Sequence, residues 1–201
     1  MPDLAQLFNH YGSDKDVNGG YAQLYTILLE PVRLEIQTLL EIGIGTMVPG
    51  ARSSMVGYAL PGYRPGGSLR AWRDFLPNAK ILGIDVQPDT IFTEERISTF
   101  LVDSTDNAKI RALGWPRLDV IIDDGSHRAE DQLSTLRNFW PLLVDNGLYV
   151  IEDIFLGNAM SEHPELIEEI VGRTTPFFFV GHTERLCVLK KTCVNTSRKV
   201  Y

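Results

Sequence analysis

The sequence has few cysteines, no long apolar run and no excess of basic residues, and each shortage excludes a class of protein. Only Cys187 and Cys193 occur among the 201 residues. Their spacing matches no zinc or redox motif, so we expect two reduced thiols. No apolar run approaches the roughly 18 residues of a membrane-spanning helix. The N-terminus has neither a basic nor a long apolar segment, so we expect no secretory signal and a cytoplasmic protein.

Acidic residues outnumber basic ones, 26 to 19, which gives a net charge of −7 at pH 7. A surface of that sign repels phosphate backbones and anionic lipids, so we expect neither a nucleic acid nor a membrane as a partner. Hydrophobic residues make up 44% of the sequence, which suits one domain over 1–201 with a substantial core. Whether copies of the chain form a homo-oligomer is left open.

Apolar runs alternate with helical patterns, as in parallel βαβ units. The last two of seven predicted strands are too close for a crossover helix and should form an antiparallel hairpin. Five parallel strands and a closing hairpin are the layout of the class I S-adenosylmethionine (SAM) methyltransferase fold, an α/β Rossmann-like fold with a mostly parallel, seven-stranded sheet. The predicted strands are Thr38–Gly43, Lys80–Val86, Ile97–Val102, Leu118–Ile122, Leu148–Glu152, Phe177–Gly181 and Arg185–Lys190.

Helices are predicted between these strands. Residues 1–37 are expected to be largely helical, with one helix over Gly20–Leu40 that Pro31 interrupts. Ser68 is the predicted N-cap of a helix over Leu69–Leu76. Two further helices are expected at Ala129–Val144, followed by a turn over 145–147, and at Glu165–Gly172.

Two of the apolar strands end in acidic residues. Asp123 and Asp124 follow one strand, and Glu152 and Asp153 end the next. Parallel α/β sheets bind ligands at the carboxyl ends of their strands, so these carboxylates should meet there. Asp124, Glu152 and Asp153 offer hard oxygen ligands, which suit Mg²⁺ or Mn²⁺ better than zinc. Which of Asp123 and Asp124 faces the metal is left open, with Asp124 preferred.

His127 follows Asp124 by three residues and is the predicted general base. A hydroxyl group is a weak acid, and both a divalent cation and a neutral imidazole promote the loss of its proton. Plainer interpretations exist for both features: His127 as a surface residue at a helix start, and the pair Glu152–Asp153 as a solvated strand end.

Polar residues and glycines at the ends of the first three strands predict a nucleotide-like cofactor. The first predicted strand contains Glu41 and ends in a turn with Gly43 and Gly45. A dinucleotide-binding motif would have a third glycine at position 48, where this sequence has Val48. Glu41 suits the ammonium group of an amino-acid-bearing cofactor. A carboxylate after the second strand can accept hydrogen bonds from ribose hydroxyls. Each acid alone is typical of a solvated strand end or a cap, whereas together they favour SAM. The predicted cofactor-binding residues are Glu41, Gly43, Gly45, Ser68, Asp85, Val86, Asp103, Ser104 and Asp123.

The segment 46–67 is rich in Gly, Pro, Ser, Met and Tyr. Long loops inside compact domains are usually functional lids or disordered, so we predict a lid in which Met47, Met55, Tyr58 or Tyr63 covers the cofactor or acceptor. A loop without function is the alternative.

Several sequence segments resemble those of the macrolide and deoxysugar O-methyltransferases, a family that includes the mycinamicin and rhamnosyl types. They are Tyr11–Lys15, Leu40–Gly45, Gly66–Trp72, Ile84–Asp85, Ile121–His127 and Tyr149–Asp153. The resemblance implies SAM- and Mg²⁺-dependent methylation of sugar hydroxyls in antibiotic biosynthesis. It also implies metal ligation by Asp124, Glu152 and Asp153, a base role for His127, and a place near the site entrance for 11–15. Because the chain is short, we expect it to lack the additional N-terminal domain of the mycinamicin type, and roles of that domain are not carried over.

The leading hypothesis is therefore a metal-dependent SAM O-methyltransferase acting on a small, glycosylated acceptor. A catechol or other phenol is an alternative acceptor, since it also chelates Mg²⁺. A non-catalytic SAM-binding domain is a second alternative, but the combination of acids and His127 argues against it, because a sensor needs no base. An RNA methyltransferase would want a basic face.

Overall fold

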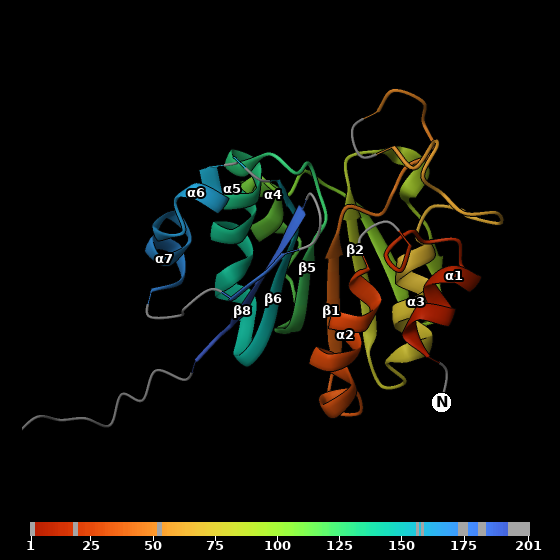
Figure 1. Ribbon diagram of the computed structural model, residues 1–201, viewed down its shortest axis with the longest axis horizontal. Helices are drawn as coiled ribbons and strands as arrows, with labels where there is room; N and C mark the ends of the chain where they lie inside the picture. The colour runs from red at the N-terminus through yellow and green to blue at the C-terminus, as the bar shows by residue number, and fades with distance from the viewer. Residues whose placement is uncertain are drawn as a thin grey trace, which may run out of the picture.

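A mixed β-sheet runs through the molecule, with helices on both of its faces (Figure 1). The computed structural model describes residues 3–17, 20–51, 54–155, 157, 159–172, 177–180 and 184–192. Within these residues the sheet has eight strands in the order β3-β4-β2-β1-β5-β6-β8-β7. The strands are β1 (Thr38–Ile42), β2 (Lys80–Asp85), β3 (Thr93–Glu94), β4 (Ile97–Leu101), β5 (Leu118–Asp123), β6 (Leu143–Phe155), β7 (Phe177–Val180) and β8 (Glu184–Lys190).

The predicted topology is confirmed. Strands β4, β2, β1, β5 and β6 pair in parallel, whereas β8 pairs antiparallel with both β6 and β7. This is the class I methyltransferase arrangement, with the hairpin folded so that β8 lies beside β6. The two-residue strand β3, which was not predicted, adds an antiparallel edge next to β4.

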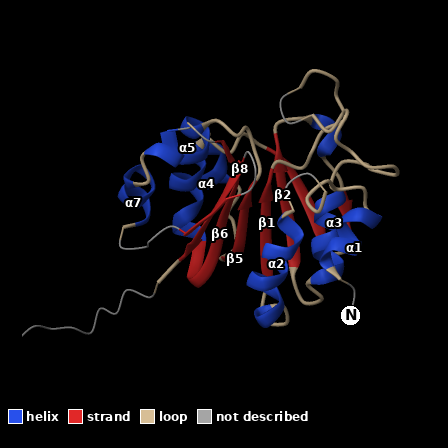
Figure 2. Cartoon of the chain, in the orientation of Figure 1, coloured by secondary structure: helices blue, strands red, loops and turns tan. Residues whose placement is uncertain are grey.

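Helices enclose the sheet, as Figure 2 shows. Apolar residues of α1, α2 and α3 bury one face of the sheet, and those of α4, α5 and α7 bury the other. Strands covered on both faces need nearly continuous apolar runs, which explains the sequence pattern. The helices are α1 (Leu4–His10), α2 (Tyr21–Leu29), α3 (Gly67–Phe75), α4 (Asn107–Ala112), α5 (Ala129–Phe139), α6 (Ala159–Glu162) and α7 (Glu165–Val171).

Several predicted helix boundaries are wrong. The helix expected over Gly20–Leu40 ends at Leu29, because Pro31 enters a short 3₁₀ turn at Glu30–Val32. Helix α3 begins after Gly66, whose left-handed φ of 82° makes it the N-cap, so Ser68 lies inside the first turn and does not cap the helix.

The region after α5 also differs from the prediction. Helix α5 ends at Phe139, and a 3₁₀ turn that contains Pro141 leads directly into β6 at Leu143. The turn expected over 145–147 therefore lies within β6, where Asn146 has a φ of 65° and the pairing with β5 shifts register. A bulge of this kind lets a strand continue through turn-forming residues.

The structure also bears on the predictions about the cysteines and about membrane-spanning helices. Cys187 is buried in β8 and forms no disulfide, whereas Cys193 lies outside the described residues. Among the described helices, none combines the length and the apolar character needed to cross a membrane.

Candidate active site and metal centre

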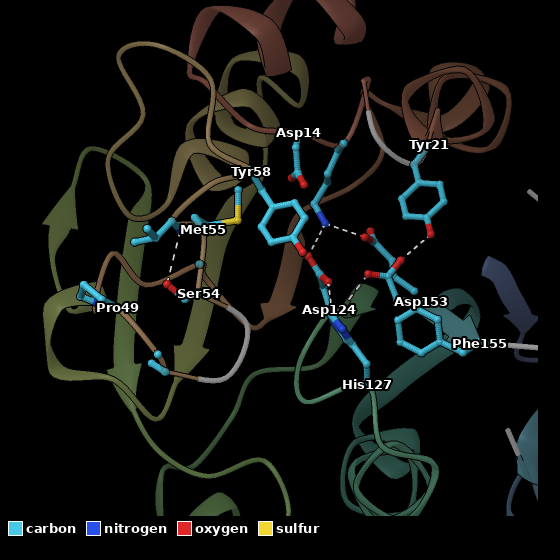
Figure 3. A pocket seen from close by; sticks show the side chains of 16 residues that line it. Asp14, Tyr21, Pro49, Ser54, Met55, Tyr58, Asp124, His127, Asp153 and Phe155 are labelled. Atoms are coloured by element: carbon cyan, nitrogen blue, oxygen red, sulfur yellow. Dashed lines mark hydrogen bonds and ion pairs between the residues drawn. The ribbon is translucent and has the colours of Figure 1, made fainter. Parts of the chain in front are cut away.

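The predicted acidic residues line a cavity of about 560 Å³ at the carboxyl ends of β5 and β6. Its walls come from three parts of the chain: the segment between α1 and α2, the loop after β1, and the ends of these two strands. Figure 3 shows the side chains of Asp124, His127 and Asp153 pointing toward one another, with Tyr58 and Met55 nearby. Residues distant in sequence thus converge on one cavity.

A bulge in β6 brings Glu152 and Asp153 to this cavity together. The sequence predicts that the strand ends at Glu152, but β6 continues to Phe155, and its register against β8 shifts between Ile151 and Ile154. Neighbouring side chains in a regular strand point to opposite faces, so an unbulged strand would turn one carboxylate away. The bulge, with Asp153 at a left-handed φ of 53°, lets both residues line the cavity.

His127 lies between two of the carboxylates. Its Nε2 is 3.1 Å from Asp124 Oδ1 and 3.7 Å from Asp153 Oδ2. Burial lowers the pKa of His127, but the hydrogen bond that its ring donates to Asp124 and the surrounding negative charge outweigh burial and raise this pKa to about 9. In the metal-free protein the imidazole is therefore protonated at neutral pH.

The same three side chains fit a metal ion. Ligand atoms of Asp124, His127 and Asp153 all lie within 4.8 Å of one another. Two carboxylates and an imidazole, or three carboxylates if Glu152 takes the place of His127, are donor sets for a divalent cation. The structure thus brings together all four residues that the sequence singled out for chemistry.

Lys15 is a central member of the cluster that residue-level sequence reasoning missed. Its ammonium group lies 2.7 Å from both Asp124 Oδ2 and Glu152 Oε2, and 3.3 Å from Glu41 Oε1. Burial lowers the pKa of Lys15, but these three carboxylates raise it well above its ordinary value, so the group stays charged. Only the family resemblance of 11–15 gave a signal, by placing that segment near the entrance.

Two tyrosines of α2 hold the acids of the bulge. The Tyr25 hydroxyl donates a hydrogen bond to Glu152 Oε1, and the Tyr21 hydroxyl donates to Asp153 Oδ1. Gln132 of α5 fixes the bulge from the other side, because its Nε2 donates to the Glu152 carbonyl oxygen at 2.9 Å. Both tyrosines fall in the helix predicted over Gly20–Leu40, and their hydroxyls gave no separate signal in the sequence.

Most predicted cofactor residues line a second cavity of about 260 Å³ beside the first. It includes six of the nine, namely Gly43, Asp85, Val86, Asp103, Ser104 and Asp123. Asp85 accepts hydrogen bonds from the backbone of Ile44 and Gln87, each at 2.8 Å. Asp123 is buried, which raises its pKa to about 7, and its carboxylate faces the hydroxyl of Tyr149.

Comparison with known proteins places this site in a family. Over 156 residues, 77% of this chain, the sequence is 33% identical to the 8-demethyl-8-alpha-L-rhamnosyl tetracenomycin-C 2'-O-methyltransferase of Streptomyces olivaceus. It is 31% identical over 157 residues, again 77% of the chain, to the mycinamicin VI 2''-O-methyltransferase of Micromonospora griseorubida. The chain belongs to the sugar O-methyltransferase family. It spans only 38% and 36% of the lengths of these two relatives.

A solved structure agrees with this family. All of the chain superposes on 58% of the MycE methyltransferase of the mycinamycin pathway, which was solved with Mg, SAH and mycinamycin VI. The TM-score is 0.74 and the sequence identity 25%. No protein-family model matches the chain.

Two predicted cofactor residues lie away from both cavities. Glu41 is fully buried; its Oε2 accepts a hydrogen bond from Trp72 Nε1 at 3.1 Å, and its Oε1 faces Lys15. The Ser68 hydroxyl contacts the same carboxylate, and its hydrogen bond partly offsets the burial that raises the pKa of Glu41. The ammonium partner of Glu41 is thus a lysine of the chain itself, and cofactor contacts by these two residues remain a prediction.

The glycines of β1 have different neighbours. Gly45 lines the larger cavity. Gly43 has a φ of 88°, and a Cβ there would lie 1.9 Å from the Asp124 carbonyl oxygen. Glycine is required at this position because the carbonyl group of Asp124 lies against it. Gly43 also lines the second cavity, where a ligand could approach it.

The predicted lid, 46–67, borders the larger cavity. Met55 and Tyr58 line it, whereas Met47 is 40% exposed and is not part of the lining. The Tyr63 hydroxyl donates to the Gly45 carbonyl oxygen at 2.7 Å and so ties the loop to the glycine motif. This is the orange loop that rises above the sheet in Figure 1. Its role as a lid remains a prediction.

Proposed function

We propose that the chain transfers a methyl group from SAM to a hydroxyl of a glycosylated natural product, with a divalent cation in the site. The observation that carries this proposal is the convergence of Asp124, His127, Glu152 and Asp153 in one cavity, directly beside the cavity of the predicted cofactor residues. The tetracenomycin and mycinamicin relatives, whose names state sugar O-methylation, support the substrate class.

SAM would occupy the smaller cavity. Asp85 would accept hydrogen bonds from the ribose hydroxyls, and Asp103 with Ser104 would bind the adenine edge. Asp123, which lines the same cavity, would receive a donor of the cofactor. Gly45 borders the neighbouring cavity, so the methyl group would point there from the glycine motif.

The divalent cation would be Mg²⁺ or Mn²⁺, held by Asp124, Glu152 and Asp153. When bound, the ion would polarise the acceptor hydroxyl and offset the negative charge of the carboxylates. His127 lies against the same carboxylates, and their charge is what keeps it protonated in the metal-free protein. With that charge offset, Nε2 of His127 would be neutral and able to take the hydroxyl proton.

The acceptor would enter over the side chains of Tyr58, Met55 and Phe155, which line the larger cavity. Aromatic faces next to polar groups suit a sugar ring, whose faces are apolar and whose edge carries hydroxyls. A catechol would also present two neighbouring oxygens to the ion and is the alternative acceptor.

The test is a methyl-transfer assay with SAM and three acceptors: a rhamnosylated polyketide, a macrolide glycoside and a catechol. Mass spectrometry should detect one added methyl group on a glycoside. EDTA should abolish the product, and Mg²⁺ should restore it. Methylation of the catechol alone would replace the sugar with a phenol, and turnover that is indifferent to EDTA would contradict the role of the metal.

A matched pair of variants tests the ligand set. Glu152→Gln should weaken Mn²⁺ binding, because it removes a charged ligand, whereas His127→Ala should leave Mn²⁺ affinity nearly unchanged. The reverse pattern would make His127 a ligand together with Asp124 and Asp153, the group whose ligand atoms already lie within 4.8 Å.

A further inference from the structure

Lys15 contacts two of the residues that are proposed to bind the metal. Its Nζ lies 2.7 Å from an oxygen of Asp124 and from an oxygen of Glu152, so it bridges two of the three proposed ligands. The Lys15 side chain is only 4% exposed, so water does not screen these contacts. A buried ammonium that bridges two carboxylates neutralises charge in the manner of a bound cation.

Both oxygens of Glu152 already have partners. Oε2 accepts from Lys15 at 2.7 Å, and Oε1 accepts from the Tyr25 hydroxyl. A divalent cation brings two positive charges and binds carboxylate oxygens at about 2.0–2.6 Å. Like charges that close repel strongly in a buried site. An ion bound to Glu152 would therefore favour movement of the ammonium group away from Oε2.

A third carboxylate, that of Glu41, lies next to Lys15 and could take up its ammonium group. Glu41 Oε1 is buried and lies 3.3 Å from Nζ, a longer contact than the two that Lys15 makes with Asp124 and Glu152. Glu41 lies on β1 and lines neither cavity, so it does not compete for the metal itself. A short movement of Nζ toward Glu41 would keep the ammonium paired while it releases Asp124 and Glu152.

We propose that Lys15 is a resident counter-ion: it holds Asp124 and Glu152 together in the metal-free protein and transfers to Glu41 when a divalent cation binds. Lys15 is thus a positioning residue. The inference rests on the proposed metal site and adds an exchange of partners within it. It also gives the buried carboxylate of Glu41 a purpose that requires no contact with the cofactor.

The experiment is a titration of the EDTA-stripped full chain with Mn²⁺ alone, followed by the electron paramagnetic resonance of the free ion. Lys15→Gln should bind Mn²⁺ more tightly, by about tenfold, because the competing cation is gone. Glu41→Gln should bind it more weakly by a similar factor, because the lysine loses its alternative partner. Lys109→Gln, which removes a 69%-exposed lysine paired with Asp106, is the matched control and should change nothing.

Thermal unfolding supplies a second measurement. In EDTA, Lys15→Gln should unfold at a lower temperature than the parent chain, since three carboxylates lose their counter-ion. Mn²⁺ should then raise its unfolding temperature by more than it raises that of the parent. A role limited to structure would lower stability with and without the ion and would not give opposite affinity changes in the two variants.

The outcomes separate the two proposals. If the parent chain binds no Mn²⁺, the metal site fails and the exchange fails with it. If the parent binds Mn²⁺ but Lys15→Gln binds it equally or less tightly, the metal site stands and the counter-ion role is overturned. If Lys15→Gln does not fold, Glu41→Gln decides the matter, because unchanged or tighter binding in that variant would overturn the exchange.

Discussion

Replacing Gly43 with alanine should displace the main chain at Asp124 and so disturb the candidate site. A Cβ at Gly43 would lie 1.9 Å from the Asp124 carbonyl oxygen and 2.7 Å from its carbonyl carbon. Both are main-chain atoms, so no side-chain rotation relieves the clash. The residue also has a φ of 88°, which L-residues rarely adopt. We expect Asp124, the predicted metal ligand that follows β5, to be displaced.

The magnitude follows from comparison with Gly114. Gly114 also has a positive φ, 62°, but a Cβ there would meet nothing within 4 Å. Gly114→Ala should therefore cost only the left-handed strain, about 1–2 kcal/mol of unfolding free energy. Gly43→Ala adds overpacking of about 1–3 kcal/mol, for a total of about 2–5 kcal/mol.

Urea unfolding of the parent and the two variants measures these free energies, and a Mn²⁺ titration measures the displacement of Asp124. We expect Gly43→Ala to lose at least about 1 kcal/mol more than Gly114→Ala and also to bind Mn²⁺ more weakly. Equal destabilisation with unchanged Mn²⁺ affinity would refute the argument that this glycine sets the position of the acid.

Three more predictions concern separate groups. His127→Ala should lower turnover by about 10²–10⁴-fold, the usual contribution of a general base, while SAM affinity measured by calorimetry stays within a few fold; surviving activity would exclude the base role. Asp85→Ala should weaken SAM binding without altering the Mg²⁺ requirement, and unchanged SAM affinity would remove the ribose assignment. The hydrogen bond from Arg70 outweighs partial burial and holds the pKa of Glu94 below its ordinary 4.5. Glu94 therefore contributes stability above about pH 4.5 that is lost as the pH falls, and the difference in urea stability between the parent and Glu94→Gln should shrink in acid; a difference independent of pH would contradict the ion pair.

The apolar pattern predicted the fold well because it reports burial directly. Strand β1 is buried at every position, and β5 is buried at five of six, so both appear in the sequence as short apolar runs. The three-residue gap before β8 was enough to predict the hairpin. Boundaries failed where proline or glycine changed the backbone locally, as at Pro31, Gly66 and Pro141, since the pattern of apolar residues does not register a 3₁₀ turn or a left-handed cap.

The sequence predicted the acidic residues and the histidine of the candidate site, but it did not predict the lysine that is paired with the acids. Asp124, His127, Glu152 and Asp153 were identified because acids at the ends of apolar strands are unusual. Lys15 was not, because its partners Asp124 and Glu152 lie 109 and 137 residues away in the chain. An isolated lysine in a polar segment carries no pattern that distinguishes it from a surface lysine.

The sequence by itself determined which strands form, that they run parallel and close with a hairpin, and which acidic residues lie at their ends. It could do so because buried strands are short apolar runs, and the length of each connection indicates whether the next strand is parallel or antiparallel. Tertiary structure alone decided the bulge that turns Glu152 and Asp153 to the same side, and the ion pairs of Lys15 with three carboxylates. Both depend on pairing between segments distant in the chain: β6 against β8, and the segment after α1 against β1, β5 and β6.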